Sequence, residues 1–359
     1  MIRPGKGYLP PVAIPPGETI REVLEEKYIT QAELAQRLGM TTKHVNEIIN
    51  GKAPITVETA VKMEDILGLP CSYWLNLEAI FQETKIRLRE QANKEDEVNI
   101  ARAIPYNQMA QLGWVPVTRK AAERITNLRK YFEIPSLQLI PEVYSAAFRV
   151  AQEDKAIPFA LAAWLQWGKV HSREIKTEPF SRKLLCDSIP FFRNLTTLPA
   201  NEFVSILKER CSQCGIALVF APHLDGTYAH GATEWLSSDK VMILLSLRYK
   251  YADIFWFSFF HEIAHVLNHN KKPIYINSQS NKNQIEQEAD RLAAELLLPQ
   301  KDYSKFVAET QVFSIDAVKS FAEEQGLDPC IIIGRLQRDG HIHYSELTEL
   351  KRRFDWMRQ

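Results

Sequence analysis

The chain has 359 residues, of which 45% are hydrophobic and 25% charged, and its formal net charge at pH 7 is zero. This composition is typical of a globular protein with a sizeable core, and the length predicts two or three domains. A neutral chain lacks an overall positive field that would attract polyanions. The longest apolar run, IFWFSFF, is too short to cross a membrane, and the first residues lack the apolar segment of a signal peptide.

Taken in chain order, the predicted elements give a mainly α, α+β fold class with a small β-sheet in the C-terminal part. Short apolar runs predict strands at 215–222 and 241–247, and helical patterns follow at 254–269 and 284–298. The expected divisions are an arm at 1–16, a helical domain at 17–82, a charged linker helix at 83–100, a helical middle region at 101–200, a core at 201–300 and a helical segment at 301–359.

The cysteines are five, an odd number, and they are scattered along the chain. This usage is typical of reduced thiols and predicts a cytoplasmic protein. Cys211 and Cys214 form a lone CxxC without a second pair at zinc-ribbon spacing. We interpret them as the end of a helix that closes on Gly215.

The stretch ITQAELAQRLGMTTKHVNEIINGKAPIT at 29–56 predicts a helix-turn-helix. Thr30 and Thr41 can each cap a helix, Gly39 supplies the turn, and Asn50-Gly51 ends the second helix. Residues at the start of a recognition helix meet base edges, and the preceding helix can contact phosphate. The candidate DNA contacts are therefore Gln31, Thr41, Thr42, Lys43, His44 and Asn46.

This head is not basic, because residues 1–80 contain eight Lys or Arg and ten Asp or Glu. A DNA-binding domain usually carries a basic patch, so a single copy is expected to bind DNA weakly and a dimer more strongly. The segments IPPGETIREVLEE, TQAELAQRLGMTTKHVNEIINGKAPIT and LGLPCSYWLNLEAIF resemble the HigA-type branch of the Cro/phage-repressor helix-turn-helix family. The resemblance covers about residues 14–82 and implies operator binding as a homodimer, with contact to a toxin.

The stretch FFHEIAHVLNH at 259–269 contains an HExxH motif formed by His261, Glu262 and His265. Residues four apart lie on one face of a helix, so both imidazoles can reach one Zn²⁺ at about 2.0–2.1 Å. Glu262 lies about 100° around the helix. It can therefore act as general base for the attacking water, which predicts a zinc-dependent hydrolase.

A catalytic zinc site needs a third protein ligand and one open position. Asn268 and Lys271 stand where a metzincin has glycine and its third histidine, which excludes that class. The downstream segment QIEQEADRLAAELLLP places Glu286 and Asp290 four residues apart. Glu286 can bind the metal while Asp290 holds the far nitrogen of a ligand histidine. Glu288 is the alternative ligand, because the sequence alone does not settle the helix register.

These two segments, preceded by HGATEWLSSDKVMILLSLRYKYADIFWFSFF and followed by DPCIIIGRLQRDGHIHYSELTELKRRFDW, resemble the ImmA/IrrE family of zinc metallopeptidases. The resemblance covers about residues 160–359. It implies a compact gluzincin-like fold in which His261, His265 and Glu286 bind Zn²⁺ and Glu262 is the base. It also implies a narrow substrate range, namely a specific protein such as a repressor or an antitoxin.

Other polar groups near the motif are candidates for roles outside metal binding. His269 is expected to lie outside the metal site, since a fourth protein ligand would close it. His230 is the first candidate for stabilising the oxyanion that develops during hydrolysis, and the alternatives are Tyr228, His223 and Tyr249.

The leading hypothesis is a DNA-binding transcription regulator fused to a zinc endopeptidase that cleaves one protein partner. The alternative is a non-proteolytic HigA-like antitoxin or autorepressor that binds operator DNA and a toxin. Glu262 favours the enzyme, because a structural zinc site needs no base. Self-cleavage near 85–100, between the head and the rest of the chain, is a third hypothesis.

Overall fold

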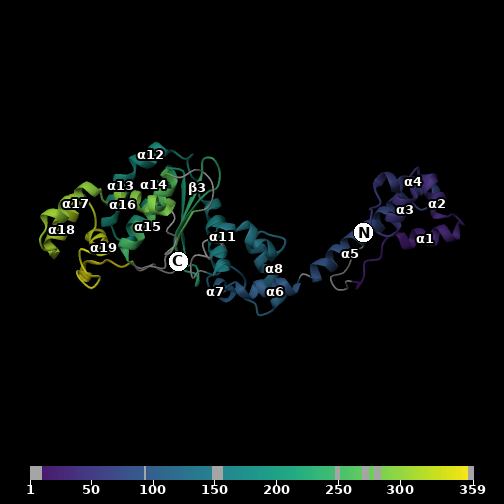
Figure 1. Cartoon of the computed structure of the whole chain (residues 1–359), viewed down its shortest axis with the longest axis horizontal. Coiled ribbons are helices and arrows are strands. Elements are labelled where there is room, and N and C mark those ends of the chain that lie inside the picture. The colour runs from purple at the N-terminus through teal and green to yellow at the C-terminus, as the bar shows by residue number, and fades with distance from the viewer. Residues whose placement is uncertain are drawn as a thin grey trace. The chain divides into compact units, whose positions relative to one another are not determined.

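The computed structural model describes residues 10–92, 94–147, 157–246, 251–268, 275–278 and 284–354 (Figure 1). The chain divides into two compact units, Met1–Glu97 and Val98–Gln359. Helices predominate and one small sheet lies in the second unit, so the predicted fold class is confirmed. Among the described residues, no helix combines the length and the apolar character needed to cross a membrane.

The first unit is a helical bundle around one apolar core. Its core includes Ile20, Leu34, Val45 and Ile49, and Trp74 is completely buried beside them. Its helices are α1 (Gly17–Glu26), α2 (Gln31–Leu38), α3 (Thr42–Ile49), α4 (Val57–Leu67) and α5 (Cys71–Ala92).

The helix ends of the helix-turn-helix follow the predicted signals. The hydroxyl of Thr30 accepts a hydrogen bond from the Glu33 backbone N–H, and that of Thr41 accepts one from His44. Gly39 ends α2 with φ of +69°, a left-handed conformation that favours glycine. The turn that sets α3 against α2 is therefore fixed by local chemistry.

The charged stretch predicted as a linker helix over 83–100 is helical at each of its described residues. Its first part continues α5, which begins at Cys71, and its second part falls in α6 (Lys94–Ala103). In the first turns of α5, Trp74 packs into the core of the first unit. This anchoring makes the start of the charged stretch an extension of a core helix.

The second unit is a small sheet between layers of helices (Figure 1). The segments before the sheet are α7 (Tyr106–Gln111), α8 (Ala121–Phe132), η1 (Leu137–Leu139), α9 (Ile140–Val143), α11 (Pro158–Glu174), α12 (Arg182–Asp187), α13 (Ile189–Asn194), η2 (Leu195–Thr197) and α14 (Ala200–Gln213). Those within and after it are α15 (Ala252–Asn268), α16 (Gln284–Leu297), α17 (Gln300–Glu309), α18 (Ile315–Gln325), α19 (Pro329–Arg338) and η3 (Thr348–Leu350).

The strand order of the sheet is β1-β3-β2-β4. The strands β1 (Ile216–Ala221) and β3 (Val241–Ser246) were predicted, and they pair in parallel. The strands β2 (Ala229–Trp235) and β4 (Tyr275–Ser278) were missed; β2 runs antiparallel to both β3 and β4. The sequence AHGATEW of β2 lacks the branched apolar run that marked the other two strands.

Both faces of β3 are covered, which explains its continuous apolar sequence. Ile243 packs with α14 and α15 on one face, whereas Leu244 packs with α11 on the other (Figure 1). Gly168 of α11 allows this close approach, because a Cβ there would lie 2.7 Å from Leu244 Cδ2. The site described below lies on the α15 side of the sheet.

The CxxC ends a helix, as predicted. Cys214 caps α14, and Gly215 follows with φ of +86°. Cys211 and Cys214 are buried free thiols, and burial raises the pKa of both. These thiols are therefore packing residues of the core and stay protonated at neutral pH.

Candidate metal centre

Three buried side chains from α15 and α16 converge on one point. The Nε2 atoms of His261 and His265 lie 2.9 Å apart. Glu286 Oε2 lies 3.0 Å from Nε2 of His261 and 3.5 Å from Nε2 of His265. These three residues form a group whose ligand atoms could hold a metal ion, and each is at most 6% exposed.

The donor set fits a divalent ion such as zinc. Two ligands bound at about 2.1 Å to a tetrahedral ion lie about 3.4 Å apart, close to the separations found here. Two imidazole nitrogens and a carboxylate oxygen so near one another repel unless a proton or a metal cation lies among them. The site therefore suits zinc, which binds imidazole and carboxylate with three protein ligands and one open position.

The orientation of His261 is fixed by its other ring nitrogen. Nδ1 of His261 lies 2.9 Å from Oδ1 of Asp290. Burial acts to raise the pKa of Asp290, but its contacts with His261 and Arg338 together lower it, so the carboxylate accepts and Nδ1 donates. Nε2 then turns its lone pair toward Glu286 and His265. This is the role that the sequence predicted for Asp290.

The pKa shifts of the three candidate ligands indicate which proton a metal ion would displace. Burial acts to lower the pKa of His261, but hydrogen bonds to Asp290 and Glu286 raise it to about 9. Burial acts to raise the pKa of Glu286, but contacts with both histidines lower it to about 2. Burial lowers the pKa of His265. Without an ion the group holds a proton on His261, so metal binding should release that proton.

Glu262 is fully buried and turns toward β2. Its Oε2 accepts a hydrogen bond from the Thr233 hydroxyl at 2.7 Å, and Oε1 has no hydrogen-bond partner among the described residues. Gly231 lies against Oε1, where a Cβ would approach to 2.4 Å. Burial raises the pKa of Glu262 to about 8, although the charge of His261 and the Thr233 hydrogen bond oppose it. A carboxylate with one oxygen held and a raised pKa suits a general base.

Thr233 and Gly231 were missed at the sequence level. They stand two residues apart in β2, so both face α15. The signal that could have identified them is the register of a strand that was itself not predicted. Once β2 is known, the glycine and the hydroxyl fall opposite the base.

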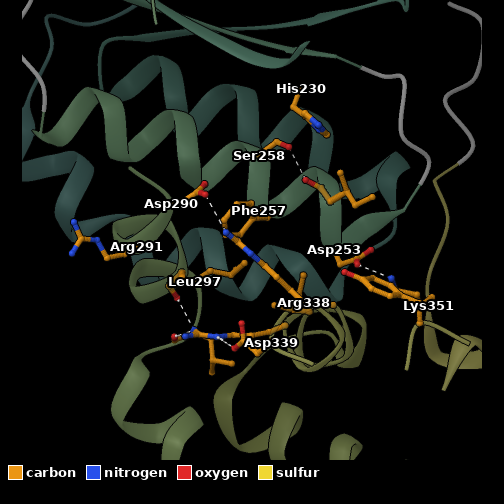
Figure 2. A pocket seen from close by; sticks show the side chains of 17 residues that line it. His230, Asp253, Phe257, Ser258, Asp290, Arg291, Leu297, Arg338, Asp339 and Lys351 are labelled. Atoms are coloured by element: carbon orange, nitrogen blue, oxygen red, sulfur yellow. Dashed lines mark hydrogen bonds and ion pairs between the residues drawn. The ribbon is translucent and has the colours of Figure 1, made fainter. Parts of the chain in front are cut away.

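His230 is the extra residue of a bulge in β2, because Ala229 and Gly231 pair with the adjacent residues Ser278 and Asn277. Bulges re-aim side chains and are common beside active sites. His230 is half-buried and lines a cavity of about 750 Å³ together with Ser258 and Asp290 (Figure 2). The structure therefore places it beside the cavity and outside the metal-ligand group.

The other sequence candidates lie in different places. Glu288 is half-buried on α16, accepts a hydrogen bond from Gln284 and lies outside the ligand group, so Glu286 is the glutamate that joins the histidines. His223 pairs with Asp225 at 3.2 Å. Tyr228 has a positive φ of 50° just before β2. Three residues discussed from the sequence lie outside the described residues: Tyr249, His269 and Lys271.

The predicted DNA-reading residues gather on the exposed side of α3. Thr42, Lys43, His44 and Asn46 are exposed. The side-chain oxygen of Asn46 accepts a hydrogen bond from Asn50 at 2.7 Å. Two more candidates flank these residues, the exposed Thr41, which caps α3, and the half-buried Gln31 at the start of α2.

Comparison with known proteins identifies two families. The helix-turn-helix family model matches residues 20–74, and the model of the IrrE N-terminal-like domain matches residues 215–323. The uncharacterized HTH-type transcriptional regulator YddM of Escherichia coli K12 is 32% identical over 63 residues, 18% of this chain and 67% of that protein. Virulence-associated protein I of Dichelobacter nodosus is 32% identical over 78 residues, 21% of this chain and 70% of that protein.

Two similar solved structures are HigA proteins. An addiction module antidote protein of the HigA family from Coxiella burnetii is 28% identical, covering 24% of this chain and 95% of that one, with a TM-score of 0.22. The Pseudomonas aeruginosa antitoxin HigA with its higBA promoter is 27% identical, covering 23% and 89%, with a TM-score of 0.21. The chain belongs to the helix-turn-helix family of transcription regulators and carries an ImmA/IrrE-like domain.

Proposed function

We propose that this regulator is also a zinc-dependent endopeptidase that cleaves a specific protein partner, a repressor or an antitoxin. The observation that carries the proposal is the position of Glu262. It follows directly after one member of the ligand group, is completely buried, and has one oxygen held by Thr233 and the other without a hydrogen-bond partner among the described residues. A structural metal site has no use for such a carboxylate.

The proposed mechanism divides the work among named side chains. Bound zinc would acidify a water molecule and polarise the carbonyl of the peptide bond to be cut. His261, His265 and Glu286 would hold the ion, and Asp290 orients the ring of His261. Glu262 accepts the proton of the attacking water and can deliver it to the leaving amine.

His230 is the candidate for stabilising the oxyanion. It is placed by the bulge beside the strand position that contacts Glu262. A donor in that place would act on charge that develops only in the transition state.

The proposal is tested by metal content and by cleavage in cells. The purified full-length chain should contain about one zinc ion, as a site with three protein ligands requires. Labelling of newly formed protein N-termini should reveal a small set of cleaved proteins in cells that express the chain. The set should disappear with His265→Ala. A chain without zinc, or the same N-termini in the variant, would contradict the proposal.

Thr233→Val provides a test of how the base is held. Valine keeps the branched shape but removes the hydroxyl that donates to Glu262 at 2.7 Å. Because a hydrogen bond to a charged group contributes about 1.5–3 kcal/mol, the cleavage rate should fall about 10- to 100-fold at unchanged zinc content. Thr233→Ser, which retains a hydroxyl, should preserve most of the rate. Equal rates for the valine and serine variants would exclude this role.

We further propose that the exposed residues of α3 read operator DNA and that the head acts as a homodimer. Lys43→Ala is expected to weaken binding to an operator fragment, since an exposed lysine at this place can contact phosphate or a base edge. Fluorescence anisotropy at two salt concentrations measures the effect. Lys62→Ala is the control, because Lys62 lies on α4 and pairs with Glu58 at 2.7 Å. An equal loss for both variants would argue against reading by α3.

A second function deserves one test because the ligand group is so deeply buried. With His261, His265 and Glu286 at most 6% exposed, the metal site could instead be structural in a non-proteolytic antitoxin or autorepressor that binds a toxin. That reading predicts that zinc removal lowers thermal stability and that no protein is cut. The N-terminal labelling experiment separates the two functions directly.

A further inference from the structure

The carboxylate of Asp290 is held from two sides. Its Oδ1 accepts from Nδ1 of His261 at 2.9 Å, and its Oδ2 accepts from Nη2 of Arg338 at 3.0 Å. Because each oxygen has its own donor, the carboxylate cannot turn without losing one contact. Arg338 belongs to α19 and follows Asp290 by 48 residues. The orientation of Asp290 against His261 therefore depends on a helix outside residues 215–323, the part matched by the IrrE N-terminal-like domain.

Arg338 is itself held in place. Its guanidinium lies over the ring of Phe257, 4.5 Å from the centroid, and Phe257 stands one helical turn before His261 on α15. Such cation–π contacts restrict the direction of the guanidinium. Figure 2 shows the guanidinium end of Arg338 joined to Asp290 by a dashed line, with Phe257 beside it. The contacts thus connect α15, α16 and α19 through one arginine.

The helix α19 is firmly docked, so it can act as a support. Three of its side chains are completely buried in the core that surrounds α15 in the second unit: Ile332, Ile333 and Leu336. Gly334 allows close contact with α15, because a Cβ there would lie 2.6 Å from Asp253 Oδ2. Gln337 is buried and donates to the backbone carbonyl oxygens of Tyr344 and Glu346. A helix fixed in this way places Arg338 with little freedom.

We propose that Arg338 is a positioning residue of the metal centre, which holds Asp290 against His261 and so raises the affinity for zinc. This inference rests on the metal site of the proposed function. A carboxylate on the far nitrogen of a ligand histidine fixes its tautomer and ring direction, and a donor on that carboxylate fixes the carboxylate in turn.

The balance of charges at the metal centre also favours a positioning role for Arg338. Glu262, Glu286 and Asp290 carry three negative charges when ionised, whereas a divalent ion supplies two positive ones. The guanidinium of Arg338 supplies a third beside Asp290. The alternative is that Arg338 and Asp290 form a surface ion pair that has no effect on zinc binding. The side chain of Arg338 is 50% exposed, and exposed ion pairs contribute little to stability.

The test is the zinc affinity of the full-length chain, measured by competition with a chromophoric chelator. Arg338→Ala should weaken zinc binding about 10-fold, the lower end of the range for groups that act through a ligand. Arg338→Lys should restore part of the affinity, because its ammonium can still reach Oδ2 of Asp290. Arg291→Ala is the matched control: Arg291 lines the same cavity and donates to the Gln287 carbonyl. It should bind zinc like the wild type.

A double variant separates positioning from a general effect on folding. In an Asp290→Asn chain, adding Arg338→Ala should change the zinc affinity no further, because the two residues act in series. Arg338→Gln serves as a second variant if the alanine chain is unstable by thermal unfolding. Unchanged affinity in Arg338→Ala, or an equal loss in the Asp290→Asn background, overturns the proposal while the metal centre stands. A wild-type chain that binds no zinc overturns both.

Discussion

Replacing Glu262 with glutamine is expected to slow peptide-bond hydrolysis about 10²–10⁴-fold, the usual contribution of a positioned general base. Glutamine has nearly the same shape, and its carbonyl oxygen can still accept the hydrogen bond from Thr233. Its amide, however, cannot take up a proton. Glu262 does not belong to the ligand group, so zinc content should not change. The measurement is the rate at which a partner found by N-terminal labelling is cut at equal zinc loading.

The matched control for this variant is Glu262→Asp. It keeps the carboxylate but shortens the side chain by one methylene, which moves the oxygens away from Gly231 and Thr233. Activity between those of the wild type and the glutamine variant is expected, because a base acts only within hydrogen-bond reach of the proton. Wild-type cleavage by the glutamine variant would show that hydrolysis does not pass through Glu262, and the proposed mechanism would have to be abandoned.

The parts of the molecule that the sequence predicted well are those encoded locally. Caps at Thr30 and Thr41 and the turn at Gly39 lie within a few residues of the helices they define. The same holds for His261 and His265, whose spacing places them on one face of α15. In each case the residues that predict the feature and the residues that form it lie in the same short segment.

The features that the sequence did not predict depend on contacts between segments far apart in the chain. β2 forms a strand because it pairs with β3 and β4, although its own sequence is rich in small and polar residues. Thr233 and Gly231 could not be assigned to the base until that pairing was known. Arg338 could not be assigned either, since nothing in its neighbourhood of the sequence points to Asp290. Tertiary packing decides these positions, and local propensity does not.

The metal site combines both kinds of information. The candidate base and two of the candidate ligands lie on α15, and the third candidate ligand and Asp290 lie on α16. One oxygen of the candidate base accepts a hydrogen bond from a residue of β2. Sites built on helices and strands hold their geometry better than sites on loops. Because α15 is buried almost along its whole length, its polar side chains keep their directions through the packing of Phe259, Phe260 and Ile263 around them.

Exchanging Glu286 for glutamine is expected to weaken zinc binding more than about 100-fold, beyond the range typical of groups that only support a ligand. The amide keeps the shape but removes the negative charge that lies 3.0 Å from Nε2 of His261. Glu288→Gln is the paired control on the same helix, since Glu288 lies outside the ligand group and accepts a hydrogen bond from Gln284. Chelator competition on both variants tests the assignment. A large loss of zinc affinity in Glu288→Gln, with wild-type affinity in Glu286→Gln, would assign the third ligand to Glu288 instead. Only the residue that supplies the third ligand atom loses a metal–oxygen bond when its carboxylate is replaced by an amide.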